Sequence, residues 1–400
     1  MSVSLALPAP ALRVLQRLQR FWQRIPLLDR WLLAELTAPL LFGVAAFTAV
    51  SLSVGVVFEL VRKVAEAGMS LAAAGQVLAL KLPSFMVLSF PMATLLSTLL
   101  AFSRLTANSE LTALRSLGVK TWRMVVPALA LATAMSALTF VFNDVIVPRA
   151  NVAASNTFDA ALGRGLSAQT GKNVVYSRFG SISPRDPKAP PAEGLTQLFY
   201  AREFRDGVMT SVTLLDLSRE QQQQILTAES ARWDQTKAMW EFQRGRLVVV
   251  DSGTKSTTSA DFSSYYYPFV RTPVDVGKLP SDAAQMTVSQ AQRALAIVEQ
   301  SGNQLETRRL RVRIQEKFAF PAICLIFGLI GSSLGVRPNA RTSRSQGFGI
   351  SVMLIFGYYL MSFIFSSLGI KGTLSPFLSA WSPVLIGLAC GLLLLRQASR

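Results

Sequence analysis

Six long apolar stretches constrain this 400-residue chain more than any other feature. Each is close to the roughly 20 residues that an α-helix needs to cross the hydrocarbon core of a bilayer. Pro83 and Pro91 lie in the second stretch and predict a kink or a broken turn there. The predicted membrane helices span residues 36–58, 77–102, 125–147, 318–336, 348–368 and 377–395.

The composition also indicates a membrane protein, because 50% of the residues are hydrophobic and 16% are charged. The formal net charge of +17 would suggest nucleic-acid binding in a soluble chain. Here the basic residues flank apolar stretches, so membrane topology and lipid headgroups explain them more simply. The absence of histidine excludes Ser-His-Asp catalysis, HExxH zinc sites and histidine-ligated haem. Cys324 and Cys390 lie inside apolar stretches and predict neither a disulfide framework nor a metal site.

The distribution of arginine and lysine predicts the orientation in the membrane. Residues 1–30 are basic, and further basic residues follow the second, fourth and sixth apolar stretches, whereas the short loops on the other side carry few. Cytoplasmic loops are the basic ones, so both termini are predicted to be cytoplasmic. We expect residues 1–30 to form a basic amphipathic helix on the cytoplasmic lipid surface.

This orientation places residues 148–315 outside the cytoplasm, between the third and fourth membrane helices. The segments 173–179, 196–204, 209–217, 239–251 and 265–270 carry strand-type residues. The turn at Arg244, Gly245 and Arg246 suits a hairpin. From residue 285 the apolar period becomes helical. An external β-sandwich with a helix returning to the membrane is therefore predicted.

A short polar stretch, residues 108–120, separates the second and third apolar stretches. Asn108 or Ser109 can cap a helix there, Glu110 lies in its first turn, and Gly118 can end it. An apolar stripe at helical spacing comprises Leu111, Leu114 and Leu117. A helix of about three turns is marginal alone in water, so it must pack on the membrane domain, on lipid or on another protein. A helical membrane hairpin and a docking helix both fit this pattern.

A further basic cluster precedes the fourth membrane helix, on the side where topology disfavours it. It comprises Arg308, Arg309, Arg311, Arg313 and Lys317. One interpretation is a solvated helix end that pairs partly with Glu306 and Glu316. The other is a cationic collar for an anionic lipid headgroup, because arginine binds phosphate through two hydrogen bonds. Arg62, Lys63 and Arg149 would lie at the same membrane depth and complete that collar.

Four carboxylates lie near the ends of the apolar stretches, namely Glu35, Glu59, Asp144 and Glu316. Acids within a membrane are candidates for function, but water at the interface can solvate these four. A helix-cap or salt-bridge role is the stronger expectation for them.

Nucleotide binding by this chain is not predicted. Residues 165–173 look like a phosphate loop, but the spacing is one residue too long and Asn173 replaces the required Ser or Thr. If ATP drives this protein, another subunit must bind it.

The chain resembles the LptF/LptG (YjgP/YjgQ) permease family of lipopolysaccharide exporters over nearly its full length. DRWLLAELTAPLLFG (29–43) is similar to the family's opening into helix one, and SELTALRSLGVK (109–120) to its cytoplasmic coupling helix. AESARWDQTKAMWEFQRG (228–245) resembles its external β-jellyroll repeat. QEKFAFP (315–321), followed by residues 357–387, is similar to helices four to six. The order and spacing of these segments carry the resemblance.

The resemblance implies an ABC-transporter permease subunit with six transmembrane helices and an inserted periplasmic all-β, jellyroll-like domain. The implied domains are 1–30 (cytoplasmic segment), 31–147 (helices one to three, with coupling helix 108–120), 148–284 (β domain), 285–315 (periplasmic helix) and 316–400 (helices four to six).

The resemblance also implies partners and site residues. Two such permeases, identical or different, would pair in the inner membrane of a Gram-negative-type bacterium. An LptB-like ATPase dimer would bind ATP and Mg²⁺, and LptC- and LptA-like bridge proteins would receive lipopolysaccharide. The implied ATPase-coupling residues are Glu110, Leu111, Leu114, Arg115 and Leu117. The basic collar would meet the lipid phosphates.

Two other classes of protein compete with this interpretation. An intramembrane enzyme would need a catalytic pair, and the apolar stretches hold no histidine and no facing aspartates. A scaffold or mechanotransmission protein would share the docking helix but would need no lipid cavity. An apolar slot lined by helices one and five, with a basic rim, would favour transport, whereas a solid bundle would favour the scaffold.

Overall fold

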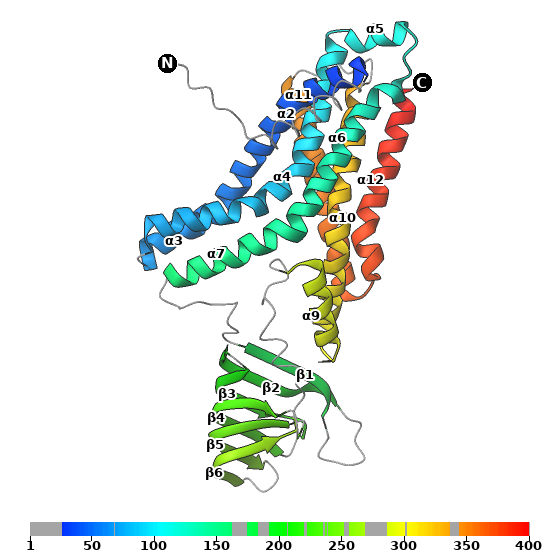
Figure 1. Ribbon diagram of the computed structural model, residues 1–400. Coiled ribbons are helices and arrows are strands. Elements are labelled where there is room, and N and C mark those ends of the chain that lie inside the picture. The colour runs from blue at the N-terminus through cyan, green and yellow to red at the C-terminus, as the bar shows by residue number, and fades with distance from the viewer. Residues whose placement is uncertain are drawn as a thin grey trace, which may run out of the picture.

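A helical bundle and a β domain attached to one of its ends make up the protein (Figure 1). The computed structural model describes residues 26–67, 69–161, 174–182, 192–205, 207–219, 222–234, 237, 239–251, 256–268, 286–300, 302–336 and 344–399. The predicted amphipathic helix in residues 1–30 and the loop at 165–173 therefore fall wholly or almost wholly outside the described residues.

Among the described residues, six helical spans are long and apolar enough to cross a membrane, which confirms the six predicted ones. The first consists of α2 (Leu27–Leu52), the π-helical turn η1 (Ser53–Val57) and α3 (Phe58–Ala67). The third consists of α6 (Thr121–Val141), η2 (Phe142–Ile146) and α7 (Val147–Ala161). The others are α4 (Leu71–Ala107), α10 (Gln304–Gly335), α11 (Arg344–Lys371) and α12 (Pro376–Ala398).

Three helical segments project from the side of the bundle where the two π-helical turns occur, and we call them the arm. Beyond η1 and η2, α3 and α7 run sideways with the first part of α4 (Figure 1). A π-helical turn inserts one extra residue and redirects a helix. Of the kink or broken turn predicted at Pro83 and Pro91, the broken turn is absent, because α4 is one continuous helix through both prolines. It curves instead from the arm into the bundle (Figure 1).

The centre of the bundle is the contact between α4 and α10. In the most apolar 18-residue segment of each of these two helices, 72% of the residues are buried. The corresponding share is 22% for the first span and 17% for α11. A Cβ atom on Gly331 would lie 2.9 Å from the backbone oxygen of Leu95, and one on Gly335 would lie 2.6 Å from Cβ of Phe102. Glycine is required at both places because it lets the two backbones approach this closely.

The β domain is one antiparallel sheet of six described strands in chain order. This confirms the all-β domain inserted between the third and fourth spans. Figure 1 shows β1 nearest the bundle and β6 farthest from it. The strands are β1 (Val174–Ile182), β2 (Ala192–Arg205), β3 (Val208–Asp216), β4 (Gln222–Asp234), β5 (Met239–Asp251) and β6 (Ser256–Tyr267).

A transverse bend crosses strands β2 to β6. Backbone pairing is interrupted at one matching position in each strand, namely at Arg202, Ser211, Glu229, Arg244 and Ser263. Ser211 and Arg244 have positive φ angles of 48° and 49°. The next residue, Gly245, must be glycine, because a Cβ there would collide with the backbone oxygen of Thr227. The predicted hairpin turn at Arg244, Gly245 and Arg246 is therefore wrong, since these residues lie inside β5.

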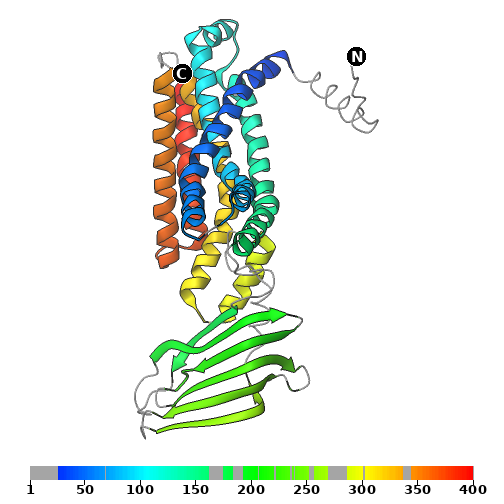
Figure 2. The same ribbon diagram turned by 90° about the vertical axis from the view of Figure 1, so that its left-hand side faces the viewer.

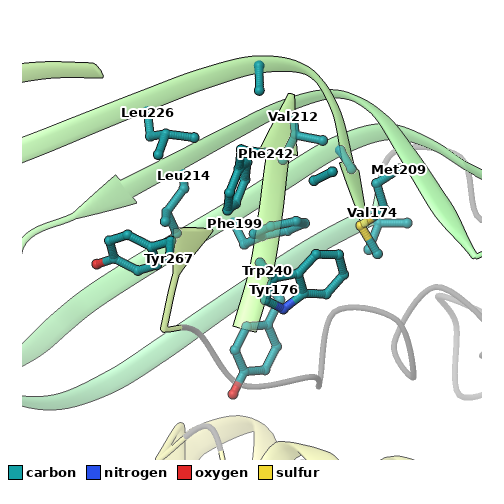
Figure 3. Packing of buried hydrophobic residues seen from close by; sticks show 13 residues of the cluster. Val174, Tyr176, Phe199, Met209, Val212, Leu214, Leu226, Trp240, Phe242 and Tyr267 are labelled. Carbon is teal, nitrogen blue, oxygen red and sulfur yellow. The ribbon is translucent and has the colours of Figure 1, made fainter. Parts of the chain in front are cut away.

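The bend folds the two halves of the sheet onto each other (Figure 2). Phe199 from one half lies 5.5 Å from Trp240 and 6.5 Å from Phe242 of the other half, measured between ring centroids. Figure 3 shows these rings among the other buried side chains of the cluster. A single sheet thus supplies both walls of an apolar core, which gives the expected sandwich without crossovers between the described strands.

A polar contact closes the two halves. The hydroxyl of Tyr267 in β6 donates a hydrogen bond to Asp216 in β3, although these strands are not neighbours in the sheet. Burial acts to raise the pKa of Asp216, but hydrogen bonds from Ser218, Tyr267 and Gln197 outweigh it and leave the pKa below its usual range.

The glycine contact yields a stability prediction. Gly331→Ala should force α10 away from α4 and cost about 1–3 kcal/mol, because overpacking a fixed interface displaces backbone. The thermal unfolding midpoint in detergent should fall by several degrees. Gly357→Ala in α11 is the matched control, because a Cβ there meets nothing within 4 Å. Equal midpoints for the two variants would contradict the close approach.

Candidate functional site

The polar stretch after the second span forms a helix at the end of the bundle opposite the β domain (Figure 1). This helix, α5, spans Glu110–Ser116 and is shorter than the predicted three turns. Ser109 precedes it with a φ of 62° and makes no capping bond through its side chain. Gly118 ends it with a φ of 84°, and the Val119 N–H reaches the Leu114 carbonyl at 3.1 Å. The predicted end at Gly118 is therefore confirmed.

The three leucines of the predicted stripe lie in different environments. Leu111 is 1% exposed and packs in a cluster with Leu36 and Met124. Leu114 is half-buried against the same cluster, whereas Leu117 is 80% exposed. Leu111 and Leu114 thus hold α5 on the bundle, and Leu117 projects outward.

The two charged residues of α5 also differ. Glu110 is half-buried and accepts a 3.0 Å hydrogen bond from the Asn108 amide. Arg115 is directed into the protein, where its Nη2 lies 2.9 Å from the carbonyl oxygen of Val336 and 3.4 Å from that of Ala398. Glu110 and Leu117 therefore remain the candidates for contact with an ATPase. Arg115 instead bonds backbone carbonyls inside the protein.

The four arginines predicted to precede the fourth span lie in the first turns of α10, and all have partners within the chain. Arg308 donates to the Lys371 carbonyl at 3.3 Å. The other three arginines form ion pairs of 2.9–3.0 Å, which are Arg309–Glu306, Arg311–Glu299 and Arg313–Glu316. These side chains are about half exposed, and exposed pairs contribute only ~0–1 kcal/mol. A phosphate could replace such carboxylates at little cost.

Lys317 belongs to the junction between the bundle and the β domain. Its Nζ lies 3.4 Å from the carbonyl oxygen of Asn143 in η2. The neighbouring Asp144 accepts a 2.7 Å hydrogen bond from the N–H of Val288. Val288 begins α9 (Val288–Gln300), the predicted helix that follows the β domain and packs on α10. Asp144 and Lys317 therefore tie the third and fourth spans to this returning helix.

The remaining predicted collar residues lie elsewhere. Arg62 and Lys63 are on α3, and Arg149 is exposed at the start of α7. Figure 1 shows α3 in the arm, apart from α9 and the first turns of α10. The eight predicted cationic residues therefore do not form one cluster within a single subunit.

Three of the four interfacial carboxylates make the cap or ion-pair contacts expected of them. Glu35 pairs with Arg104 at 3.1 Å, and Asp144 binds the first N–H of α9. Glu316 pairs with Arg313 and accepts a hydrogen bond from Ser366 at 2.5 Å. Glu59 instead lines a cavity.

Two adjoining cavities in the arm escaped sequence reasoning. One, of about 420 Å³, is open to the surface and lined mainly by apolar residues of α3 and α4, among them Leu60, Val64 and Leu78. The other, of about 400 Å³, shares Leu60 and is lined by Glu59 and Lys81. Lys81 could have indicated the second cavity from sequence, because a lone lysine inside an apolar stretch is energetically costly in a membrane and is usually functional.

The bundle exposes large apolar side chains on α2 and α11. Leu41 and Phe42 of α2 are 66% and 62% exposed, and Met353 and Phe363 of α11 are 78% and 70% exposed. Helices one and five therefore present the apolar surfaces that the transport interpretation requires. In the described part of the chain, no cluster of His, Cys, Asp or Glu could hold a metal ion.

Six membrane-crossing spans, a β domain inserted after the third and a short helix at the far end define a multi-pass transport subunit. The chain belongs to the LptF/LptG family, because the model of the lipopolysaccharide export system permease LptF/LptG matches residues 30–397. It is thus a permease of that system in the inner membrane, and LptB is the ATPase of the system. No curated protein sequence matches the chain.

The contact between Asp144 and α9 yields a prediction that distinguishes the hydrogen bond to the helix from the charge of the carboxylate. Asp144→Ala should loosen α9 and cost about 0.5–2 kcal/mol, because the first N–H of the helix loses its acceptor. Limited proteolysis in detergent should then cleave α9 faster. Asp144→Asn is the matched control, since asparagine caps as well as aspartate. Equal cleavage of the alanine variant and wild type would show that the contact does not hold α9.

Proposed function

We propose that this permease extracts lipopolysaccharide from the inner membrane and passes it through its β domain toward periplasmic bridge proteins. It works with a second LptF/LptG-type permease, identical or different, and with LptC- and LptA-like proteins. Family membership supports the substrate, since the matched family exports lipopolysaccharide.

The observation that carries this proposal is the exposed apolar surface on the first span and α11. These two spans are the least buried of the six. A second permease facing them encloses an apolar slot for acyl chains, because lipid tails and such side chains are equally apolar. The half-exposed arginines of α10 lie at the β-domain end of this surface and receive the phosphates (Figure 1).

Energy enters at the opposite end. An LptB-like ATPase dimer docks on α5 through Glu110 and Leu117, and ATP and Mg²⁺ belong to that subunit. α5, the start of α2 and the end of α12 lie together at this end, away from the β domain (Figure 1). With the basic flanks, this arrangement supports cytoplasmic termini and a periplasmic β domain.

The alternative is a mechanotransmission scaffold without lipid transport. It shares α5 and the β domain but needs no apolar face on α2 and α11. The exposed surface on these helices and the export family both favour transport.

Neutralising the arginine cluster tests lipid capture. Replacing Arg308, Arg309, Arg311 and Arg313 with Gln should lower photo-crosslinking of lipopolysaccharide about tenfold, which corresponds to ~1.4 kcal/mol. The control replaces Arg104, whose exposed side chain forms a single ion pair at the opposite end of the bundle, away from the proposed lipid path. Equal crosslinking in the cluster variant and wild type would show that the four arginines form only a solvated helix end and do not bind lipid.

Reversing one charge tests ATPase docking. Glu110→Arg should abolish co-purification of the ATPase, because it places a cation where the docking surface supplies an anion. Membrane insertion and the gel-filtration profile should stay unchanged, since the Glu110 side chain bonds only to neighbouring Asn108. Undiminished co-purification would remove Glu110 from the docking surface.

A further inference from the structure

We infer that Arg115 is a positioning residue that transmits movement of α5 to the fourth and sixth membrane helices. The inference rests on the proposed docking of an ATPase at α5. It gives Arg115 a role in coupling hydrolysis to transport instead of a role in contacting the ATPase.

The guanidinium of Arg115 joins two helix ends. Nη2 lies 2.9 Å from the carbonyl oxygen of Val336, which caps α10, and 3.4 Å from that of Ala398, the last residue of α12. Carbonyls at the end of a helix lack intrahelical partners and carry partial negative charge. Nη2 of a permanently charged guanidinium carries two N–H donors and can therefore serve two such acceptors at once.

The residues that flank α5 bind the same two helix ends. The hydroxyl of Thr106, before α5, donates to the carbonyl oxygen of Gly335 at 2.7 Å. The hydroxyl of Thr121, after α5, lies 3.5 Å from the carbonyl oxygen of Ala398. The turn from α4 through α5 to α6 therefore grips α10 and α12 at three points. Among them, Arg115 alone contacts both helices and alone carries charge.

Close packing makes α4, α10 and α12 one mechanical unit. Gly331 and Gly335 bring α10 against α4, as described above. A Cβ on Gly387 or Gly391 of α12 would lie 2.8 Å from a methyl group of Ile326 or Leu329 of α10, so α12 packs directly on side chains of α10. Displacing either helix end therefore displaces all three helices, because close-packed interiors transmit strain.

α10 carries this displacement to the β domain. Its 32 residues extend ~48 Å at 1.5 Å per residue. At the far end, Arg311 pairs with Glu299 of α9 at 2.9 Å, and Leu310 packs in the α9 cluster. One continuous helix, α10, thus connects the contact with Arg115 to the helix that follows the β domain.

The experiment measures lipopolysaccharide transferred per ATP hydrolysed by the complete complex in proteoliposomes. This ratio does not change when less complex folds, because transfer and hydrolysis then fall together. For Arg115→Ala, we expect the ATPase to co-purify as with wild type and the ratio to fall about tenfold. Arg115→Lys should give an intermediate ratio, since an ammonium group can bond the carbonyls but lacks the planar fork.

Arg104→Ala is the matched control, because Arg104 lies at the same end of the bundle, is exposed and forms a single ion pair with Glu35. Its ratio should equal that of wild type. An unchanged ratio in Arg115→Ala overturns the inference. Loss of ATPase co-purification in Arg115→Ala also overturns it, by assigning Arg115 to the docking surface. Failure of wild type to retain any ATPase removes the proposed docking itself, and the inference falls with it.

Discussion

The contact between α4 and α10 is the constraint on which the remaining structure depends. In a bilayer, apolar side chains gain nothing by turning from lipid to protein, so helices associate through close packing. Gly331 and Gly335 allow that packing, and Thr106 continues the contact to the end of α10. The other helices surround this pair and leave α2 and α11 to face lipid or another subunit.

The positions of the spans and of the inserted domain could be predicted from sequence, because apolar length and strand composition are local properties. The bend of the sheet could not. It depends on positive φ angles at Ser211 and Arg244, whose residue types give no warning, and on alignment across five strands. Arg244, Gly245 and Arg246 carried a hairpin signal, yet Gly245 fits the bend instead. Strand β4 was missed because glutamine, alanine and glutamate are weak strand formers.

The candidate site shows the same division between local and tertiary information. Gly118 predicted the end of α5 correctly, because a left-handed residue after a helix is a local requirement. The direction of Arg115 depends on carbonyls more than 200 residues away, which no spacing rule contains. The helical period grouped Leu111, Leu114 and Leu117, but α5 ends at Ser116, so Leu117 lies beyond the helix and is exposed while Leu111 is buried.

One ionic contact at the α5 end of the bundle differs in geometry from the arginine pairs at the β-domain end. At the α5 end, Arg123 holds Asp29 through two hydrogen bonds of 2.6 and 2.9 Å, and the Asp29 side chain is 14% exposed. A bidentate, partly buried pair holds α2 and α6 in fixed register. At the β-domain end, the half-exposed Arg309 and Arg313 of α10 pair with Glu306 and Glu316 through one hydrogen bond each. Under the proposed function, the half-exposed arginines suit exchange of a carboxylate for a lipid phosphate, whereas the bidentate pair suits an end that transmits force.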